Sequence, residues 1–131
     1  MRYLEKSFSF DEKSGYTVNA KLQVIGEDII VTVYGGEKPH VGAVAVAVPR
    51  ASLSDPGIIS ASTSIITMTG HKDDEVVKEM APEIASRTNR VVVISAGMHW
   101  EKVDEQILGI VMNNCKGLSK EIVAYLRNEL I

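Results

Sequence analysis

The first half of the chain alternates apolar and polar residues in the manner of half-buried β-strands. In residues 16–25 the apolar side chains fall on one face and the polar side chains on the other. Residues 26–28 predict a turn, and the β-branched run at residues 29–34 predicts the second arm of a hairpin. Residues 4–10 predict one further strand, at an edge. We therefore expect the chain to begin with an antiparallel meander.

The strand predicted at residues 41–48 has two unlike faces. One face carries only valines and the other only alanines: Val44, Val46 and Val48 against Ala43, Ala45 and Ala47. We expect the alanine face to lie under a closely packed helix. The alternative is that Gly42 and these small side chains leave room for a flat ligand.

The second half mixes strands with helices. Residues 62–69 and 90–96 predict strands, and the helical spacing of residues 73–89 between them completes a βαβ unit if the two strands are parallel. Pro82 predicts a kink or a break within that helix.

Two more helices are expected at the C-terminal end of the sequence. Residues 103–114 have helical spacing, Gly117 predicts a break, and a last helix begins near Ser119. Together, the predicted strands and helices indicate one α+β domain over residues 1–131, with a mixed sheet and helices packed on it.

Composition narrows the classes of function. The formal charge of -3 argues against a nucleic-acid partner, which usually meets a basic face. The single cysteine, Cys115, allows no intramolecular disulfide, and the longest apolar run is too short to cross a membrane. We expect a cytoplasmic protein without a membrane partner. The hydrophobic content of 45% and the exposed strand edges predict a homodimer or a higher oligomer.

The three histidines each lie at the end of a predicted strand. His40 precedes its strand, whereas His71 and His99 follow theirs. If the strands before His71 and His99 are parallel, and the strand after His40 is antiparallel to them, all three lie at one sheet edge. Such a cluster can bind a metal, transfer protons or hold a phosphate. No metal-ligand spacing is present, and ordinary surface histidines are the simpler alternative.

The turn Gly70-His71-Lys72-Asp73 joins a strand to a helix, where free N–H groups can hold an anion. Gly70 would let a phosphate approach the backbone. The alternative is that Asp73 or Asp74 simply caps the helix.

Asn113 and Asn114 have two interpretations as well. They form a C-cap pair, or they offer amide groups to the edge of a heterocycle. Trp100, which follows His99, either packs in the core or stacks on a ligand ring.

Taken together, Gly36-x-x-Pro39-His40-x-Gly42, Gly70-His71-Lys72-Asp73 and Asn113-Asn114 resemble the small prenylated-flavin chaperones that accompany phenolic-acid decarboxylases such as gallate decarboxylase. The resemblance implies a non-catalytic carrier that binds prenylated flavin mononucleotide (FMN) and assists a UbiD-type decarboxylase. The residues expected to bind the cofactor are Gly36, Pro39, His40, Gly42, Gly70, His71, Lys72, Asp73, His99, Asn113 and Asn114.

Two other classes of function stay open on the residues alone. One is a small enzyme that uses the loop histidines as acid or base on a heterocyclic or phosphorylated substrate. The other is a structural subunit of a homo-oligomer with no ligand.

Overall fold

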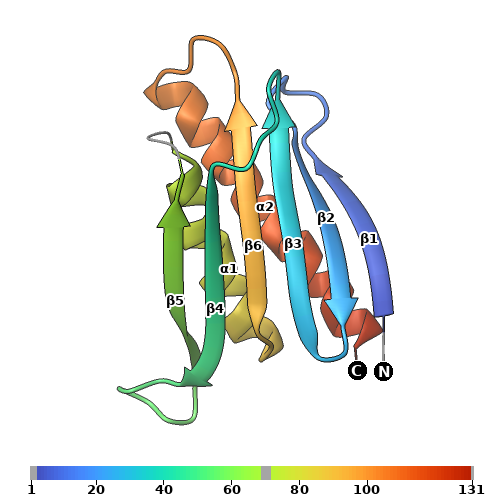
Figure 1. Cartoon of the computed structure of the whole chain (residues 1–131), viewed down its shortest axis with the longest axis vertical. Coiled ribbons are helices and arrows are strands. Elements are labelled where there is room, and N and C mark those ends of the chain that lie inside the picture. Colours follow the sequence, from blue (N-terminus) through green and yellow to red (C-terminus); the bar gives the residue numbers. More distant parts are fainter. Residues whose placement is uncertain (1–2, 69–71, 131) are drawn as a thin grey trace.

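The computed structural model describes residues 3–68 and 72–130, which form a sheet with two helices on one of its faces (Figure 1). The sheet has six strands in the order β1-β2-β3-β6-β4-β5. The strands are β1 (Tyr3–Phe10), β2 (Val18–Ile25), β3 (Asp28–Gly36), β4 (Ala43–Ala51), β5 (Ile59–Thr67) and β6 (Val92–His99). The helices are α1 (Asp73–Thr88) and α2 (Glu105–Glu129). The predicted α+β class is confirmed.

The core lies between the sheet and the helices. Alternate residues of β2 and β3 are buried there, as the period-2 pattern predicts, and β6 contributes Val92, Ile94 and Ala96. The helices supply the opposing layer with apolar stripes at helical spacing. Helix α1 packs on β4, β5 and β6, whereas α2 contacts β1, β2 and α1.

The register fixes which strand ends meet. β4 is antiparallel to both β5 and β6, so β5 and β6 run in the same direction, as the βαβ prediction requires. They are not neighbours, because β4 lies between them. The start of β4 at Ala43 is paired with Ala96 near the end of β6 and with Thr67 at the end of β5. The end of the sheet at which β4 begins and β5 and β6 end is therefore the place where the functional residues were expected.

The alanine face of β4 is covered. Ala43, Ala45 and Ala47 are at most 1% exposed, and β4 packs against α1. The small side chains thus allow close helix packing, as the first interpretation predicts. The alternative of a flat ligand on this face is wrong, because the helix occupies the space.

The helix breaks predicted at Pro82 and Gly117 do not occur. Helix α1 runs through Pro82 without ending, because Val77, Met80 and Ile84 on its buried stripe anchor both sides of the proline in the core. Helix α2 is one helix of 25 residues that includes Gly117. A Cβ at Gly117 would come within 2.2 Å of the Phe10 ring. This glycine therefore allows β1 to lie close to α2, and it does not end the helix.

Within the described residues, neither helix is long and apolar enough to span a membrane.

Candidate functional site

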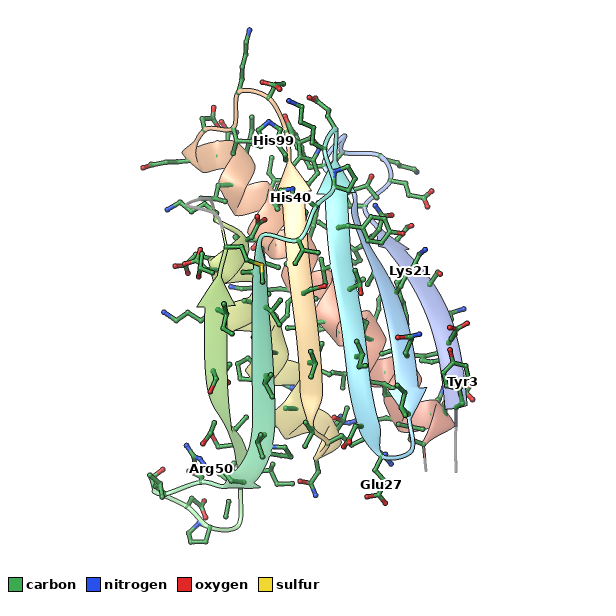
Figure 2. The ribbon with its side chains drawn as sticks, in the orientation of Figure 1. Tyr3, Lys21, Glu27, His40, Arg50 and His99 are labelled. Atoms are coloured by element: carbon green, nitrogen blue, oxygen red, sulfur yellow. The ribbon has the colours of Figure 1, made fainter. Side chains whose placement is uncertain are left out.

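The segment between β3 and β4 crosses directly over the end of β6. The Glu37 N–H donates to the His99 carbonyl at 2.7 Å, and the Gly42 N–H donates to the Ala96 carbonyl at 2.8 Å. A Cβ at Gly97 would lie 1.6 Å from the His40 carbonyl oxygen. Only glycine at position 97 therefore lets this segment lie on the strand. His40 and His99 consequently share one end of the sheet, as predicted (Figure 2).

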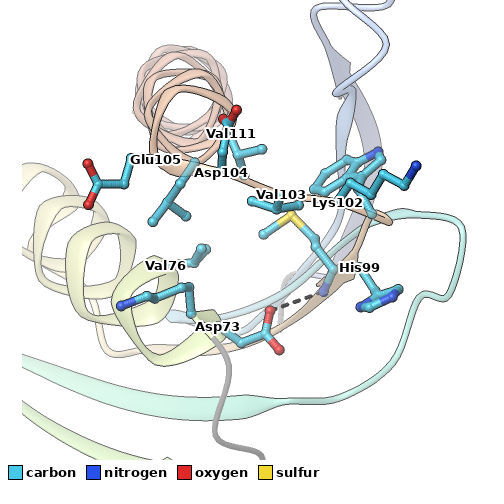
Figure 3. A pocket seen from close by; sticks show the side chains of 12 residues that line it. Asp73, Val76, His99, Lys102, Val103, Asp104, Glu105 and Val111 are labelled. Carbon is cyan, nitrogen blue, oxygen red and sulfur yellow. Dashed lines mark hydrogen bonds between the residues drawn. The ribbon is translucent and has the colours of Figure 1, made fainter.

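Asp73 ties this crossing segment to the helix. Its carboxylate is buried and accepts the Met98 N–H at 3.1 Å (Figure 3). The same carboxylate lies 3.0 Å from His40 Nε2. A Cβ at Gly42 would lie 1.9 Å from the same carboxylate, so the glycine makes room for it. One side chain thus links α1, β6 and the segment before β4.

The predicted capping role of Asp73 is wrong. Lys72 occupies the N-cap position of α1, and no side chain caps it. Asp73 is the first helical residue, and its carboxylate turns towards the Met98 N–H and His40 Nε2 instead of capping its own helix.

The contacts of His40 engage both nitrogens of its ring. Nδ1 lies 2.8 Å from the Lys38 carbonyl, which can only accept, so Nδ1 is the donor there. Nε2 lies 3.0 Å from the buried Asp73 carboxylate. Because both ring nitrogens are occupied, His40 positions the segment and has no nitrogen free for proton transfer to a substrate.

A cleft of about 590 Å³ lies beside Asp73 (Figure 3). Its walls are the start of α1, the end of β6 with the following loop, and the first turns of α2. Apolar side chains form much of the lining: Val76, Met98, Trp100, Val103, Leu108 and Val111. Charged or titratable ones complete it: Lys72, Asp73, His99, Lys102, Asp104 and Glu105. The volume falls in the range of small-molecule and cofactor sites.

Trp100 forms part of the cleft wall, and its ring packs against Tyr16. Its ring meets Tyr16 edge to face, with centroids 5.7 Å apart and planes at 68°. Trp100 therefore packs in the structure and also lines the cleft, so both of its proposed roles are compatible.

The predicted site residues divide between the cleft and its support. Lys72, Asp73 and His99 line the cleft, and His40 and Gly42 contact Asp73 from the other side. Gly36 pairs with His99 at the end of β3, and Pro39 lies in the crossing segment. Gly70 and His71 lie outside the described residues, so their anion-binding role stays a prediction.

Asn113 and Asn114 lie in the middle of α2, away from the cleft lining. Asn113 is exposed, whereas Asn114 is buried and donates from Nδ2 to the Tyr16 carbonyl at 3.0 Å. The predicted C-cap pair is wrong because α2 continues past Gly117. Asn114 instead fastens the helix to the segment before β2.

No three side chains of the metal-ligating types come together within residues 3–68 and 72–130. His99 Nε2 lies 3.4 Å from Glu101 Oε1, in the loop that bounds the cleft. Each of the two described histidines therefore lies beside a carboxylate, His40 beside the buried Asp73 and His99 beside the exposed Glu101.

Several cleft residues lie outside the predicted set, notably Val76, Met98, Leu108 and Val111. One residue in the sequence could have located them, because Asp is a favoured N-cap residue and Asp104 marks the start of α2. In the structure its carboxylate caps the helix by accepting the Ile107 N–H at 2.8 Å. It places the start of a second helix just after His99, and thus at the same sheet edge as the start of α1.

The buried position of Cys115 predicts that its thiol is unreactive in the folded chain. Burial, with smaller contributions from the negative charges of Asp73 and Glu79, raises the pKa of its thiol to about 12. We expect the native thiol to stay unlabelled by a disulfide reagent at pH 8 and to react fully in denaturant, as followed by absorbance. Rapid labelling of the folded chain would contradict the buried position.

Comparison with known proteins gives the family. Residues 12–127 match the model of the prenylated flavin chaperone LpdD-like domain. The chain belongs to this family. "Protein LpdD" of Lactiplantibacillus plantarum (strain ATCC BAA-793 / NCIMB 8826 / WCFS1) is 28% identical over 123 residues, covering 88% of this chain and 82% of the relative.

The fold of this family member also occurs in a chaperone of another kind. The chain is similar to a crystal structure of a novel chaperone complex for yeast 20S proteasome assembly, with a TM-score of 0.60 and 20% identity over 100% of both chains. At that identity the likeness concerns the fold alone.

Proposed function

We propose that the chain binds prenylated FMN in the cleft beside Asp73 and carries it to a UbiD-type decarboxylase. The observation that supports this most directly is the cleft itself, a largely apolar space of about 590 Å³ whose charged lining includes Lys72 and Lys102, in a member of the prenylated flavin chaperone family.

The cleft offers each part of the cofactor a suitable environment. Val76, Leu108 and Val111 provide apolar surface for the ring system. Lys72 and Lys102 provide positive charge for the phosphate. Carboxylates also line the cleft, at Asp73, Asp104 and Glu105, and that of Asp73 is paired with His40.

The arrangement of the histidines favours a carrier over an enzyme. His40 has both ring nitrogens engaged, and the described residues that line the cleft include no serine, threonine or cysteine. The cofactor supplies electron-accepting ring chemistry once it is in the decarboxylase. The chain's own residues bind it, orient it and shield it from water.

Anaerobic titration of the purified chain with prenylated FMN, followed by absorbance and calorimetry, tests binding. A 1:1 saturable transition is expected, and no binding at high micromolar concentration would overturn the proposal. Delivery is tested separately by adding loaded chain or free cofactor to an apo-decarboxylase of the UbiD type. Faster activation by the loaded chain is expected, and equal rates would remove the carrier role while leaving binding intact.

Lys72→Ala should weaken cofactor binding by about 1 kcal/mol, or roughly fivefold, since an exposed ion pair is screened by solvent. Lys78→Ala is the matched control, because Lys78 is also an exposed lysine of α1 but lies outside the cleft. Titration of both variants at low and moderate salt measures the effect. Equal affinities for the two variants would place the phosphate elsewhere.

A further inference from the structure

The strand β5 lies at one edge of the sheet, and its outer side has no neighbouring strand in the described part of the chain (Figure 1). Its nine residues, Ile59–Thr67, include no charged residue, no proline and no glycine. Natural proteins usually protect an exposed edge with charge, proline or a bulge, because its free backbone groups pair readily with another strand. An edge without such protection indicates a strand that pairs with a partner.

The opposite edge of the sheet is protected in the usual way. Strand β1 carries Glu5 and Lys6 in its first half. The Glu5 carboxylate accepts hydrogen bonds from Tyr3 and Gln23. The Lys6 ammonium lies 5.7 Å from the centre of the Tyr125 ring of α2. Charge is therefore fixed along β1 and absent along β5, so the two edges of one sheet differ in their capacity to accept a further strand.

Aliphatic side chains of β5 are exposed on both faces of the sheet. Ile65 pairs with Ala45, and Ala45 pairs with Ile94, so the three share one row on the helix side. Their exposed fractions are 37%, 1% and 0%, so the exposure rises only at the outer strand. Ile66 points to the other face and is 66% exposed. A strand added beside β5 would cover both isoleucines.

The hydrogen bonds at the two ends of β5 show which of its backbone groups are free. At the start of the strand, the Ser52 N–H donates to the Ile58 carbonyl at 2.8 Å. At its end, the Met68 N–H donates to the Gly42 carbonyl at 2.8 Å. The backbone direction alternates along an antiparallel strand, so the even-numbered residues between 58 and 68 also bond to β4. The odd-numbered residues present their N–H and C=O groups at the free edge: Ile59, Ala61, Thr63 and Ile65.

We propose that the free edge of β5 binds an extended, uncharged segment of the enzyme that receives the cofactor, and that this segment pairs with β5 as an added strand. The identity of the partner rests on the carrier function proposed above. Main-chain hydrogen bonds to the odd-numbered residues would supply affinity, and alternate side chains of the segment would contact Ile65 and Ile66. β5 ends at the same end of the sheet as the cleft, and Lys72 of the cleft lining follows soon after Thr67. Docking on β5 therefore holds the cleft close to the recipient enzyme.

The size of the edge favours an extended segment over a second copy of the chain. Nine residues at about 3.3 Å each and a thickness of about 10 Å give an edge of roughly 300 Å². A stable interface between two folded proteins buries about 800 Å² on each partner, so an edge-to-edge contact of two copies falls well short. A flexible segment is not limited to the edge, because its side chains reach over both faces of β5. Delivery of a cofactor also needs only a transient complex.

The affinity of the chain for an apo-decarboxylase of the UbiD type, measured by biolayer interferometry, tests the proposal. Thr63→Pro removes one free N–H and leaves the bonds to β4 intact, since proline is tolerated where the N–H of an edge strand faces solvent. It should weaken the complex at least about tenfold. Thr63→Val is the matched control, because it keeps the free N–H and a β-branched side chain, and it should bind like the parent. If Thr63→Pro fails to fold by circular dichroism, Ile65→Lys replaces it, since lysine protects natural edges.

The docking edge and the carrier function fail in different ways. Equal enzyme affinity of folded Thr63→Pro and the parent would overturn the docking edge and leave the carrier function intact. No complex between the parent chain and the enzyme would overturn both. Anaerobic titration with prenylated FMN should give one affinity for all variants, because neither Thr63 nor Ile65 lines the cleft. A loss of cofactor affinity in Thr63→Pro as large as its loss of enzyme affinity would also overturn the docking edge.

Hydrogen exchange at single-residue resolution gives an independent measurement. In the free chain, the amides of Ala61, Thr63 and Ile65 should exchange faster than those of Ser62 and Ser64, which bond to β4. Addition of the apo-enzyme should slow the three outward amides at least about tenfold and leave the other two unchanged. Protection of the outward amides in the chain alone, growing with its concentration, would overturn the proposal in favour of a second copy at this edge.

Discussion

Asp73→Ala is expected to lower the free energy of unfolding by about 3 kcal/mol, at the low end for breaking a buried pair because His40 is partly exposed. The substitution removes the acceptor for the Met98 N–H and for His40 Nε2. The Met98 amide would then be buried without a partner, and the segment that crosses β6 would lose its link to α1. Urea denaturation followed by circular dichroism measures the change.

Two further variants separate the hydrogen bonds of Asp73 from its charge. Asp73→Asn keeps an acceptor for Met98 and a donor for neutral His40, so it should cost about 1 kcal/mol or less. Asp74→Ala also removes a carboxylate from the first turn of α1, and within residues 3–68 and 72–130 no side-chain hydrogen bond of Asp74 links that helix to another element. A loss as large for Asp74→Ala as for Asp73→Ala would show that the helix dipole, not the link, is responsible.

The sequence predicted the strands well because their pattern is local. Alternation in residues 16–25 reports which side of each strand is buried, and the structure buries Val18, Ala20, Leu22 and Val24 accordingly. The helix breaks at Pro82 and Gly117 were wrong because both depend on contacts distant in sequence. Gly117 in particular is explained by the Phe10 ring, which lies more than a hundred residues earlier in the chain.

The position of the candidate site was predictable in part, because it follows from the directions of the strands. Histidines and glycines at strand ends could be assigned to one sheet edge once the strand directions were inferred, and His40 and His99 lie there. The role of each residue at this end of the sheet depends on contacts in the folded chain, so the sequence alone did not predict it. Asp73 is indistinguishable in sequence from a capping residue, and only the approach of Met98 and His40 shows that it is a link.

Val103→Trp is expected to weaken binding of prenylated FMN at least about 100-fold, the largest effect on the proposed function. Val103 lines the cleft from the loop before α2 and is 45% exposed, so an indole ring can replace its side chain without entering the core (Figure 3). The ring would occupy space that the cofactor needs. Thermal unfolding should stay close to that of the parent, because no buried contact is lost.

Leu53→Trp makes the equivalent exchange of an exposed aliphatic residue in the loop between β4 and β5. That loop follows the end of β4 opposite the cleft, so the variant should bind like the parent. Anaerobic calorimetry on both variants supplies the comparison, with the cofactor's absorbance as a second readout that the added indole does not obscure. Unchanged affinity in a folded Val103→Trp would mean that the cofactor binds outside this cleft. A loss in both variants would indicate a general effect of added indole rather than occlusion.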